Sequence, residues 1–202
     1  SPMDVSHIRP HIHRRPMSIR KRKTVGIDLG TTNTVVARNF ETLPMEGGGC
    51  VMPSAVAFLP SGAKLIGKAA RRRRAMDPKN TILSAKRVIG ARWRSSYTSQ
   101  FREHYPYDLL EGPDGWAVFK TRAGIVCPVE VGSTIIAGLC ERTNYPVQDV
   151  HAVVTAPVGF DNRRREATAL AVSNAKFASV RVIEEPIATA LDYAHEKGIV
   201  HR

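Results

Sequence analysis

Residues 25–33 have the sequence VGIDLGTTN, in which a short apolar strand bearing one acid runs into a turn of glycine and hydroxyl residues. Extended character resumes after the turn, so the segment predicts a β-hairpin. Because Gly30 has no Cβ, backbone N–H groups and the hydroxyls of Thr31 and Thr32 can point at phosphate oxygens. Asp28 precedes the turn, where an acid can hold magnesium through water. The alternative is a hairpin turn that binds nothing.

The composition is that of a globular chain. It has 202 residues, of which 43% are hydrophobic, enough for one or two domains with a core. No apolar run approaches the ~18 residues of a membrane-spanning helix, so we expect no membrane association. Cys50, Cys127 and Cys140 are odd in number and widely spaced. They predict reduced thiols in a reducing compartment, the cytoplasm.

The net charge of +12 is concentrated in two segments. Residues 1–24 contribute six of these charges and Arg71–Arg74 contribute four. Aromatic residues make up only 6% of the chain, too few for the stacking platforms of many nucleic-acid-binding proteins. We therefore expect no specific nucleic-acid partner, only salt-sensitive attraction to polyanions.

Residues 1–23 are expected to be a basic appendage. They contain three prolines, no apolar periodicity and no apolar core of a secretory signal. Their hydrophobicity is too low to offset the entropy of ordering, which predicts a disordered leader or an artificial extension.

Four motifs follow one another along the rest of the chain. They are VGIDLGTTNTVVA at 25–37, PKNT at 78–81 with KRVIG at 86–90, VVTAP at 153–157 with Phe160 and REAT at 165–168, and VIEEPIATA at 182–190. Together they strongly resemble the start of the ATPase domain of heat shock protein 70 (DnaK-type) chaperones. The segment from Arg92 to Ala123 is much less similar to that family.

The expected elements alternate between strands and helices. Strands are predicted at 24–29, 33–38, 55–59, 152–156 and 179–183, and helices around 68–76, 81–89, 128–142 or 144, 161–175 and 187–194. This order and the resemblance imply an α/β fold, one ribonuclease-H-like lobe of an actin-like ATPase. We expect that lobe over residues 24–202, with an inserted subdomain around 60–127.

The resemblance also implies the residues of a nucleotide site. The loop around the β- and γ-phosphates of ATP or ADP matches Gly30, Thr31, Thr32 and Asn33. Asp28 and Glu185 match acids that reach Mg²⁺ through water, and Lys86 matches the lysine that positions the attacking water. These three are the expected catalytic residues. Without the resemblance, Lys86 is one more basic residue on a solvent-facing helix.

Other matches concern communication and partners. Pro157 and Arg165 match the pair that relays the nucleotide state to the peptide-binding domain, and Arg181 aligns with a position that contacts J-domain co-chaperones. The chain departs from the family at Glu184, where the family has Asn, and at Thr189, where it usually has Ala. A nucleotide-exchange factor is a further expected partner.

Three functions remain open on this basis. The first is the N-terminal lobe of an ATP-dependent chaperone, which binds Mg·ATP phosphates. The second is a truncated, non-hydrolytic relative that acts as a protein-interaction module. The third and weakest is another actin-like or sugar-kinase-like ATPase. We find no second phosphate loop, adenosine pocket or peptide-binding domain in the sequence. We therefore expect weak ATP binding, little or no turnover by the chain alone, and client binding only through a missing domain.

Overall fold

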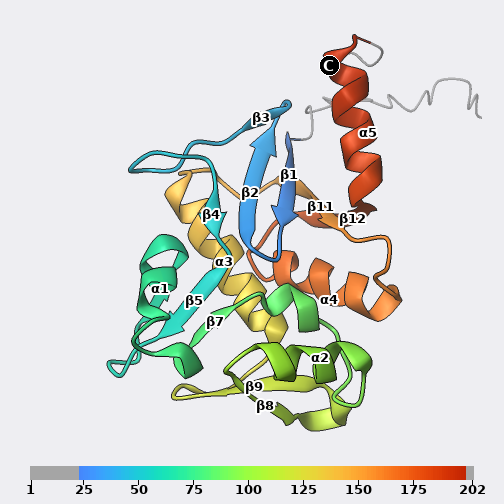
Figure 1. Ribbon diagram of the computed structural model, residues 1–202. Helices are drawn as coiled ribbons and strands as arrows, with labels where there is room; N and C mark the ends of the chain where they lie inside the picture. Colours follow the sequence, from blue (N-terminus) through green and yellow to red (C-terminus); the bar gives the residue numbers. More distant parts are fainter. Residues whose placement is uncertain (1–22, 199–202) are drawn as a thin grey trace, which may run out of the picture.

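A computed structural model describes residues 23–198 and shows a mixed α/β chain (Figure 1). The leader expected at 1–23 lies outside the described residues, apart from Lys23, which begins the first strand. Within residues 23–198, no helix combines the length and the apolar character needed to cross a bilayer.

The largest sheet combines the predicted hairpin with two strands from late in the chain. In the described residues its order is β12-β11-β1-β2-β3, and β4 also pairs with β2. Strands β1, β11 and β12 are mutually parallel, whereas β2 runs antiparallel to β1. Its strands are β1 (Lys23–Leu29), β2 (Asn33–Arg38), β3 (Glu41–Thr42), β4 (Met52–Pro53), β11 (Val150–Ala156) and β12 (Ser179–Glu184). The three parallel strands therefore end at one common edge.

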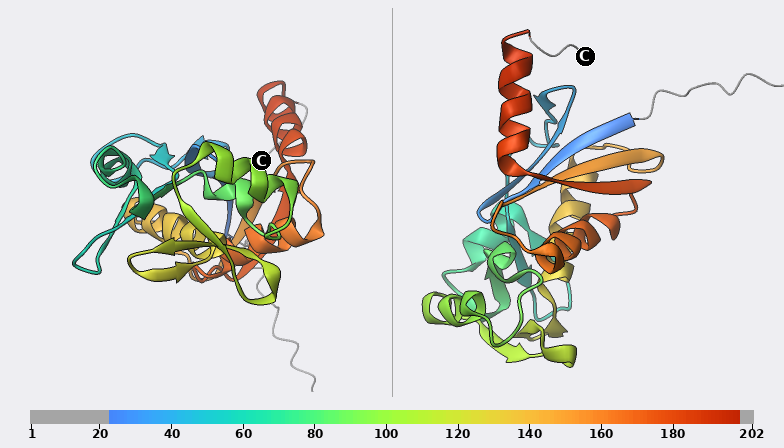
Figure 2. Two further views of the ribbon diagram at one scale, coloured as in Figure 1. Left: turned by 60° about the horizontal axis from the view of Figure 1, so that its bottom comes forward. Right: turned by 90° about the vertical axis from the view of Figure 1, so that its right-hand side faces the viewer.

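Helices cover both sides of this sheet. Helices α3 (Pro128–Arg142) and α4 (Asn162–Ser173) pack against each other and against the sheet, and α5 (Glu185–Glu196) stands on the opposite side (Figure 2). Alternate residues of β11 are buried, which places its apolar side chains in the core with Ile27 and Leu139. Burial of such side chains stabilises the fold by about 25 cal/mol per Å² of apolar surface.

Two smaller sheets and two helices lie below the main sheet in Figure 1. The first sheet contains β5 (Ala55–Phe58), β6 (Lys64–Ile66) and β7 (Thr81–Leu83) and packs against α1 (Gly67–Arg73). The second contains β8 (Asp108–Glu111), β9 (Ala117–Thr121) and β10 (Gly124–Val126). Helix α2 (Ser96–His104) contributes Phe101, whose ring contacts those of Tyr105, Tyr107 and Phe119. Short 3-10 helices occupy Pro78–Asn80, Ala85–Val88 and Pro113–Gly115.

Most predicted strands and helices are confirmed, including the residues expected to begin α4 and α3. Asp161 accepts a hydrogen bond from the backbone N–H of Arg164, so it caps α4 as expected, and Pro128 occupies the first turn of α3.

The helix predicted over 81–89 is wrong. Thr81–Leu83 is a strand that pairs with Ala55–Ala57, and only Ala85–Val88 is helical, as a 3-10 turn. Ser84 between them has a φ of 59°, in the left-handed region, so no continuous helix can pass through it. Tertiary strand pairing has overridden a helical pattern here.

The strand predicted at 55–59 is confirmed, but it does not extend the hairpin sheet. The preceding Met52–Pro53 pairs with β2, and β5 then pairs with β6 and β7. Pro53 has no N–H to donate, which favours the end of pairing with β2 at this point.

Candidate functional site

The turn after β1 is held by a serine from another segment. The Ser54 hydroxyl donates to the Gly30 carbonyl at 2.8 Å, and the Ser54 backbone N–H donates to the Thr32 carbonyl at 2.8 Å. The buried Thr34 hydroxyl lies 2.8 Å from the same serine oxygen. A Cβ added at Gly30 would lie 2.2 Å from the Asn33 carbonyl oxygen, so this turn has no room for a side chain there. Thr32 and Asn33 are exposed at its tip.

Asp28 lies next to this turn on an exposed position of β1. The Thr155 hydroxyl of the neighbouring parallel strand β11 donates to its Oδ1 at 3.1 Å. Among the described residues this is the one hydrogen bond that the Asp28 carboxylate makes, so most of the carboxylate is available to solvent and ligands. In open α/β sheets, ligands bind at the carboxyl ends of the parallel strands, which is where Asp28 stands.

Lys86 and Glu185, 99 residues apart, meet at the same edge. The Lys86 ammonium lies 2.9 Å from Glu185 Oε1, although Lys86 is only 7% exposed. Lys86 belongs to the 3-10 turn Ala85–Val88, and Glu185 begins α5 directly after β12. A carboxylate at a helix N-terminus is favoured by the helix dipole. The fold thus brings together two of the three expected catalytic residues.

Arg164 anchors the segment that bears Lys86. Its guanidinium donates to the carbonyls of Ile89 at 3.2 Å, Lys86 at 3.1 Å and Arg87 at 2.9 Å. The ring of Phe160 lies 3.8 Å from the guanidinium carbon. The side chain is buried, and burial lowers the pKa of this arginine, an effect that Tyr97 and Asp161 partly oppose. Helix α4 therefore fixes the backbone on which Lys86 stands.

The expected relay residues lie beside this anchor. Arg165 forms an ion pair with Glu184 Oε1 at 2.7 Å and donates to the Phe160 carbonyl at 3.0 Å. Glu184, the departure from the family pattern, thus holds Arg165 against the end of β12. Pro157 follows β11. Thr189, the other departure, donates to the Glu185 carbonyl within α5 at 3.2 Å. Arg181 is exposed on β12.

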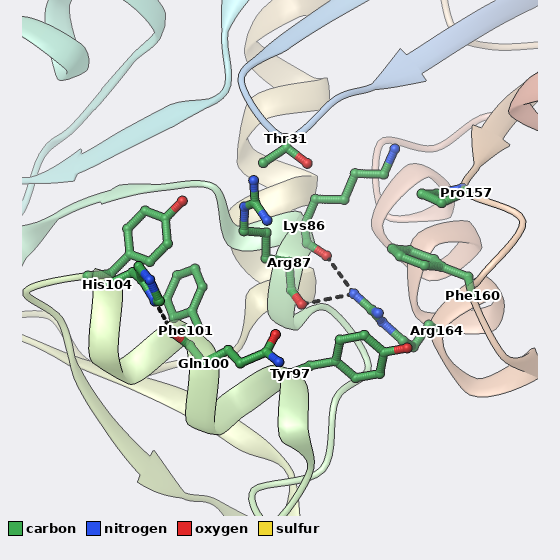
Figure 3. A pocket seen from close by; sticks show the side chains of 11 residues that line it. Thr31, Lys86, Arg87, Tyr97, Gln100, Phe101, His104, Pro157, Phe160 and Arg164 are labelled. Carbon is green, nitrogen blue, oxygen red and sulfur yellow. Dashed lines mark hydrogen bonds between the residues drawn. The ribbon is translucent and has the colours of Figure 1, made fainter.

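Two cavities open around the turn. One of about 460 Å³ is lined by Thr31, Lys86 and Pro157, together with residues of α2 and α4 (Figure 3). Another of about 200 Å³ is lined by Thr31, Thr32 and the cations Arg71 and Arg74 of the α1 region. Thr31 therefore lines both cavities, and each cavity is also lined by cationic side chains. Asp28, Gly30 and Asn33 lie at the turn but line neither cavity.

The carboxylates present are of a kind that suits a hydrated magnesium ion. Among residues 23–198 no group of three or more His, Cys, Asp or Glu side chains could enclose a metal. Mg²⁺ does not require such a cage, because it retains several waters and binds through one or two carboxylates plus substrate phosphates. The partly exposed carboxylates of Asp28 and Glu185 fit that mode, and the hydroxyl-rich turn fits phosphate.

Sequence reasoning did not identify three residues that contribute to the geometry of the site. Ser54 is an ordinary hydroxyl residue beside a strand, without a local signal, and Thr155 lies in the VVTAP motif, which assigned its side chain no role. Arg164 is the middle one of three consecutive arginines. Only its place in the helical period after the Asp161 cap distinguishes it as the buried one.

Comparisons with known proteins converge on one family. A family model described as Hsp70 protein matches residues 24–200. A chaperone protein HscA homolog from Cupriavidus metallidurans is 42% identical over 184 residues, which are 88% of this chain and 29% of that protein. The homolog from Ralstonia pickettii is 40% identical over 91% of this chain and 30% of its own length. The chain thus spans about 30% of the length of these relatives.

Proposed function

Because the chain belongs to the Hsp70 family, we propose that it forms the first lobe of an actin-like nucleotide-binding domain and binds Mg·ATP phosphates. One observation carries the proposal: the ends of the parallel strands bring the hydroxyl-rich turn, Asp28 and the Lys86–Glu185 pair to a single edge. The inserted subdomain around 60–127 supplies Lys86 and one wall of the site.

Each proposed site residue has a role that its position supports. The backbone N–H groups and hydroxyls of Gly30–Asn33 bind the phosphates. Asp28 and Glu185 would hold a hydrated Mg²⁺, which would neutralise phosphate charge. Lys86 orients the attacking water and stabilises charge on the transferred phosphoryl group, which is the main work of such sites. Its pairing with Glu185 keeps the ammonium group at the edge when no phosphate is present.

The proposed relay starts from the residues after β11. Pro157 lines the same cavity as Lys86, and Arg165 is tied to Glu184 at the end of β12. A change at the phosphates can therefore reach Arg165 through the β12–α5 junction, where Glu184 and Glu185 are neighbours. J-domain co-chaperones, nucleotide-exchange factors and unfolded client peptides are the partners proposed on family grounds.

A titration of Mg·ATP into the purified chain tests the site. Thr31→Val removes one hydroxyl and retains the side-chain shape, and Lys86→Ala removes the cation. Loss of one hydrogen bond to a charged group costs about 1.5–3 kcal/mol, so each variant should bind roughly 10- to 150-fold more weakly. Lys79→Ala is the matched control, because Lys79 pairs with Asp108 on an exposed surface and lines neither cavity.

The alternative function makes the opposite prediction. If the folded chain binds no Mg·ATP, or if Thr31→Val and Lys86→Ala bind it like the control, the phosphate-site proposal fails. The non-hydrolytic interaction module would then be the better description.

A further inference from the structure

The larger cavity has an aromatic wall that the phosphate site does not use. Rings of Tyr97, Phe101, Tyr105 and Phe160 line it, the first two from α2. Phe101 and Tyr105 are stacked, with ring centroids 4.2 Å apart. Tyr97 remains 46% exposed, so a large ring faces open space at this wall. An aromatic ligand would gain about 0.5–1.5 kcal/mol per ring contact beyond its area burial.

The same cavity is strongly cationic. Lys86, Arg87 and Arg164 all line it, and among the described residues no acidic side chain does so. Glu185 offsets Lys86, but neither Arg87 nor Arg164 forms a salt bridge within the described part of the chain. Figure 3 shows the Arg87 side chain extending from the 3-10 turn toward Thr31, with Arg164 and Tyr97 at the other end of the cavity.

We propose that this cavity binds a small aromatic anion, a planar ring system that bears one phosphate or carboxylate group. The anionic group contacts the Arg87 guanidinium and the Thr31 hydroxyl, and the ring packs against the wall that contains Tyr97 and Phe160. The volume of about 460 Å³ lies in the ordinary range of small-molecule sites. Arg87, which forms no salt bridge within the described part of the chain, and the exposed ring of Tyr97 are the complement of such a ligand in charge and in surface character.

This site overlaps the proposed phosphate site without depending on it. Thr31 and Lys86 belong to both, so an aromatic anion in the cavity should compete with Mg·ATP. Three of the four rings come from residues 97–105, which are outside the proposed phosphate-site residues. Binding of the anion is therefore expected whether or not the chain binds ATP.

The test uses 1-naphthyl phosphate, titrated calorimetrically into the full chain, beside inorganic phosphate and 1-naphthol. If charge and ring both contribute, naphthyl phosphate should bind roughly tenfold or more tightly than either simpler probe. Tyr97→Ala should weaken it about fivefold, whereas Tyr97→Phe should restore the binding. Arg87→Gln should weaken it about tenfold, and Arg94→Gln, also exposed but outside the cavity, should not.

The outcomes separate this inference from the proposed function. Naphthyl phosphate that binds no better than inorganic phosphate, or that is insensitive to both Tyr97→Ala and Arg87→Gln, overturns the inference. Both altered residues are exposed, so folded variants are expected, and circular dichroism checks this. A chain that binds naphthyl phosphate but not Mg·ATP supports the inference and contradicts the nucleotide proposal. A chain that binds Mg·ATP but not naphthyl phosphate supports the nucleotide proposal and overturns the inference.

Discussion

Replacement of Arg164 by methionine should destabilise the fold far more than its position among three arginines suggests. The change removes the donors to three carbonyls, at 2.9–3.2 Å, from a side chain that is 4% exposed. It also removes the cation that lies 3.8 Å from the Phe160 ring centroid and 4.4 Å from that of Tyr97. Methionine retains apolar volume, so the loss is mainly of hydrogen bonds and charge.

The expected magnitude follows from these contacts. A hydrogen bond to a charged group contributes about 1.5–3 kcal/mol net, but the three share one guanidinium and the freed carbonyls can partly rebind water. Each buried carbonyl left without a donor costs about 1–3 kcal/mol, so with partial rehydration of the three we expect a total loss of about 3–5 kcal/mol. For a chain of this size that loss lowers the melting temperature by roughly 6–20 °C.

Urea denaturation followed by circular dichroism measures this difference. Arg163→Met is the matched control, because Arg163 precedes Arg164 on α4 but is exposed, and its replacement should change stability by less than about 0.5 kcal/mol. Arg164→Lys keeps the charge but not the planar set of donors, so it should recover only part of the loss. Equal stability of Arg164→Met and Arg163→Met would refute the anchoring role of Arg164.

Two further perturbations test the turn and the thiols. Gly30→Ala places a Cβ 2.2 Å from the Asn33 carbonyl oxygen, so the turn must shift at a cost of about 1–3 kcal/mol, and thermal melts with and without Mg·ATP would show it. An unchanged melting temperature would contradict that geometry. Burial raises the pKa of Cys140 to about 11, so at pH 8 iodoacetamide should label the exposed Cys127 and spare Cys140 until the chain unfolds. Since an unfolded thiol ionises near pH 8.5, folding stability should also fall as pH rises from about 8.5 to about 11. Peptide mass spectrometry resolves the labelling, and equal early labelling of both thiols would rule out the buried position.

Elements defined by local chemistry were predictable from the sequence. The strand–turn–strand around Gly30 follows from an apolar run, a glycine and hydroxyl residues, and α4 starts where Asp161 can cap it. The helix at Pro128–Arg142 follows from its apolar period and its N-terminal proline. The information for each of these elements lies within a few residues, so no distant partner was needed to predict it.

The prediction over residues 81–89 failed because its outcome depended on a distant partner. Thr81–Leu83 is a strand because Ala55–Ala57 lies beside it, and no local pattern specifies that pairing. The same holds for Ser54, which became part of the turn at Gly30 only because Pro53 and β2 bring it within 2.8 Å of the Gly30 carbonyl.

The sequence by itself determined the kinds of groups available for the site: a glycine turn, two carboxylates and a lysine in ordered motifs. Only the tertiary structure decided which of them meet. Lys86 reaches Glu185 across 99 residues, Arg164 holds the backbone of Lys86 from another helix, and Glu184 pairs with Arg165. Local propensity acts over a turn or two of chain, whereas these contacts arise from the packing of the parallel sheet, whose strand ends bring distant segments to one edge.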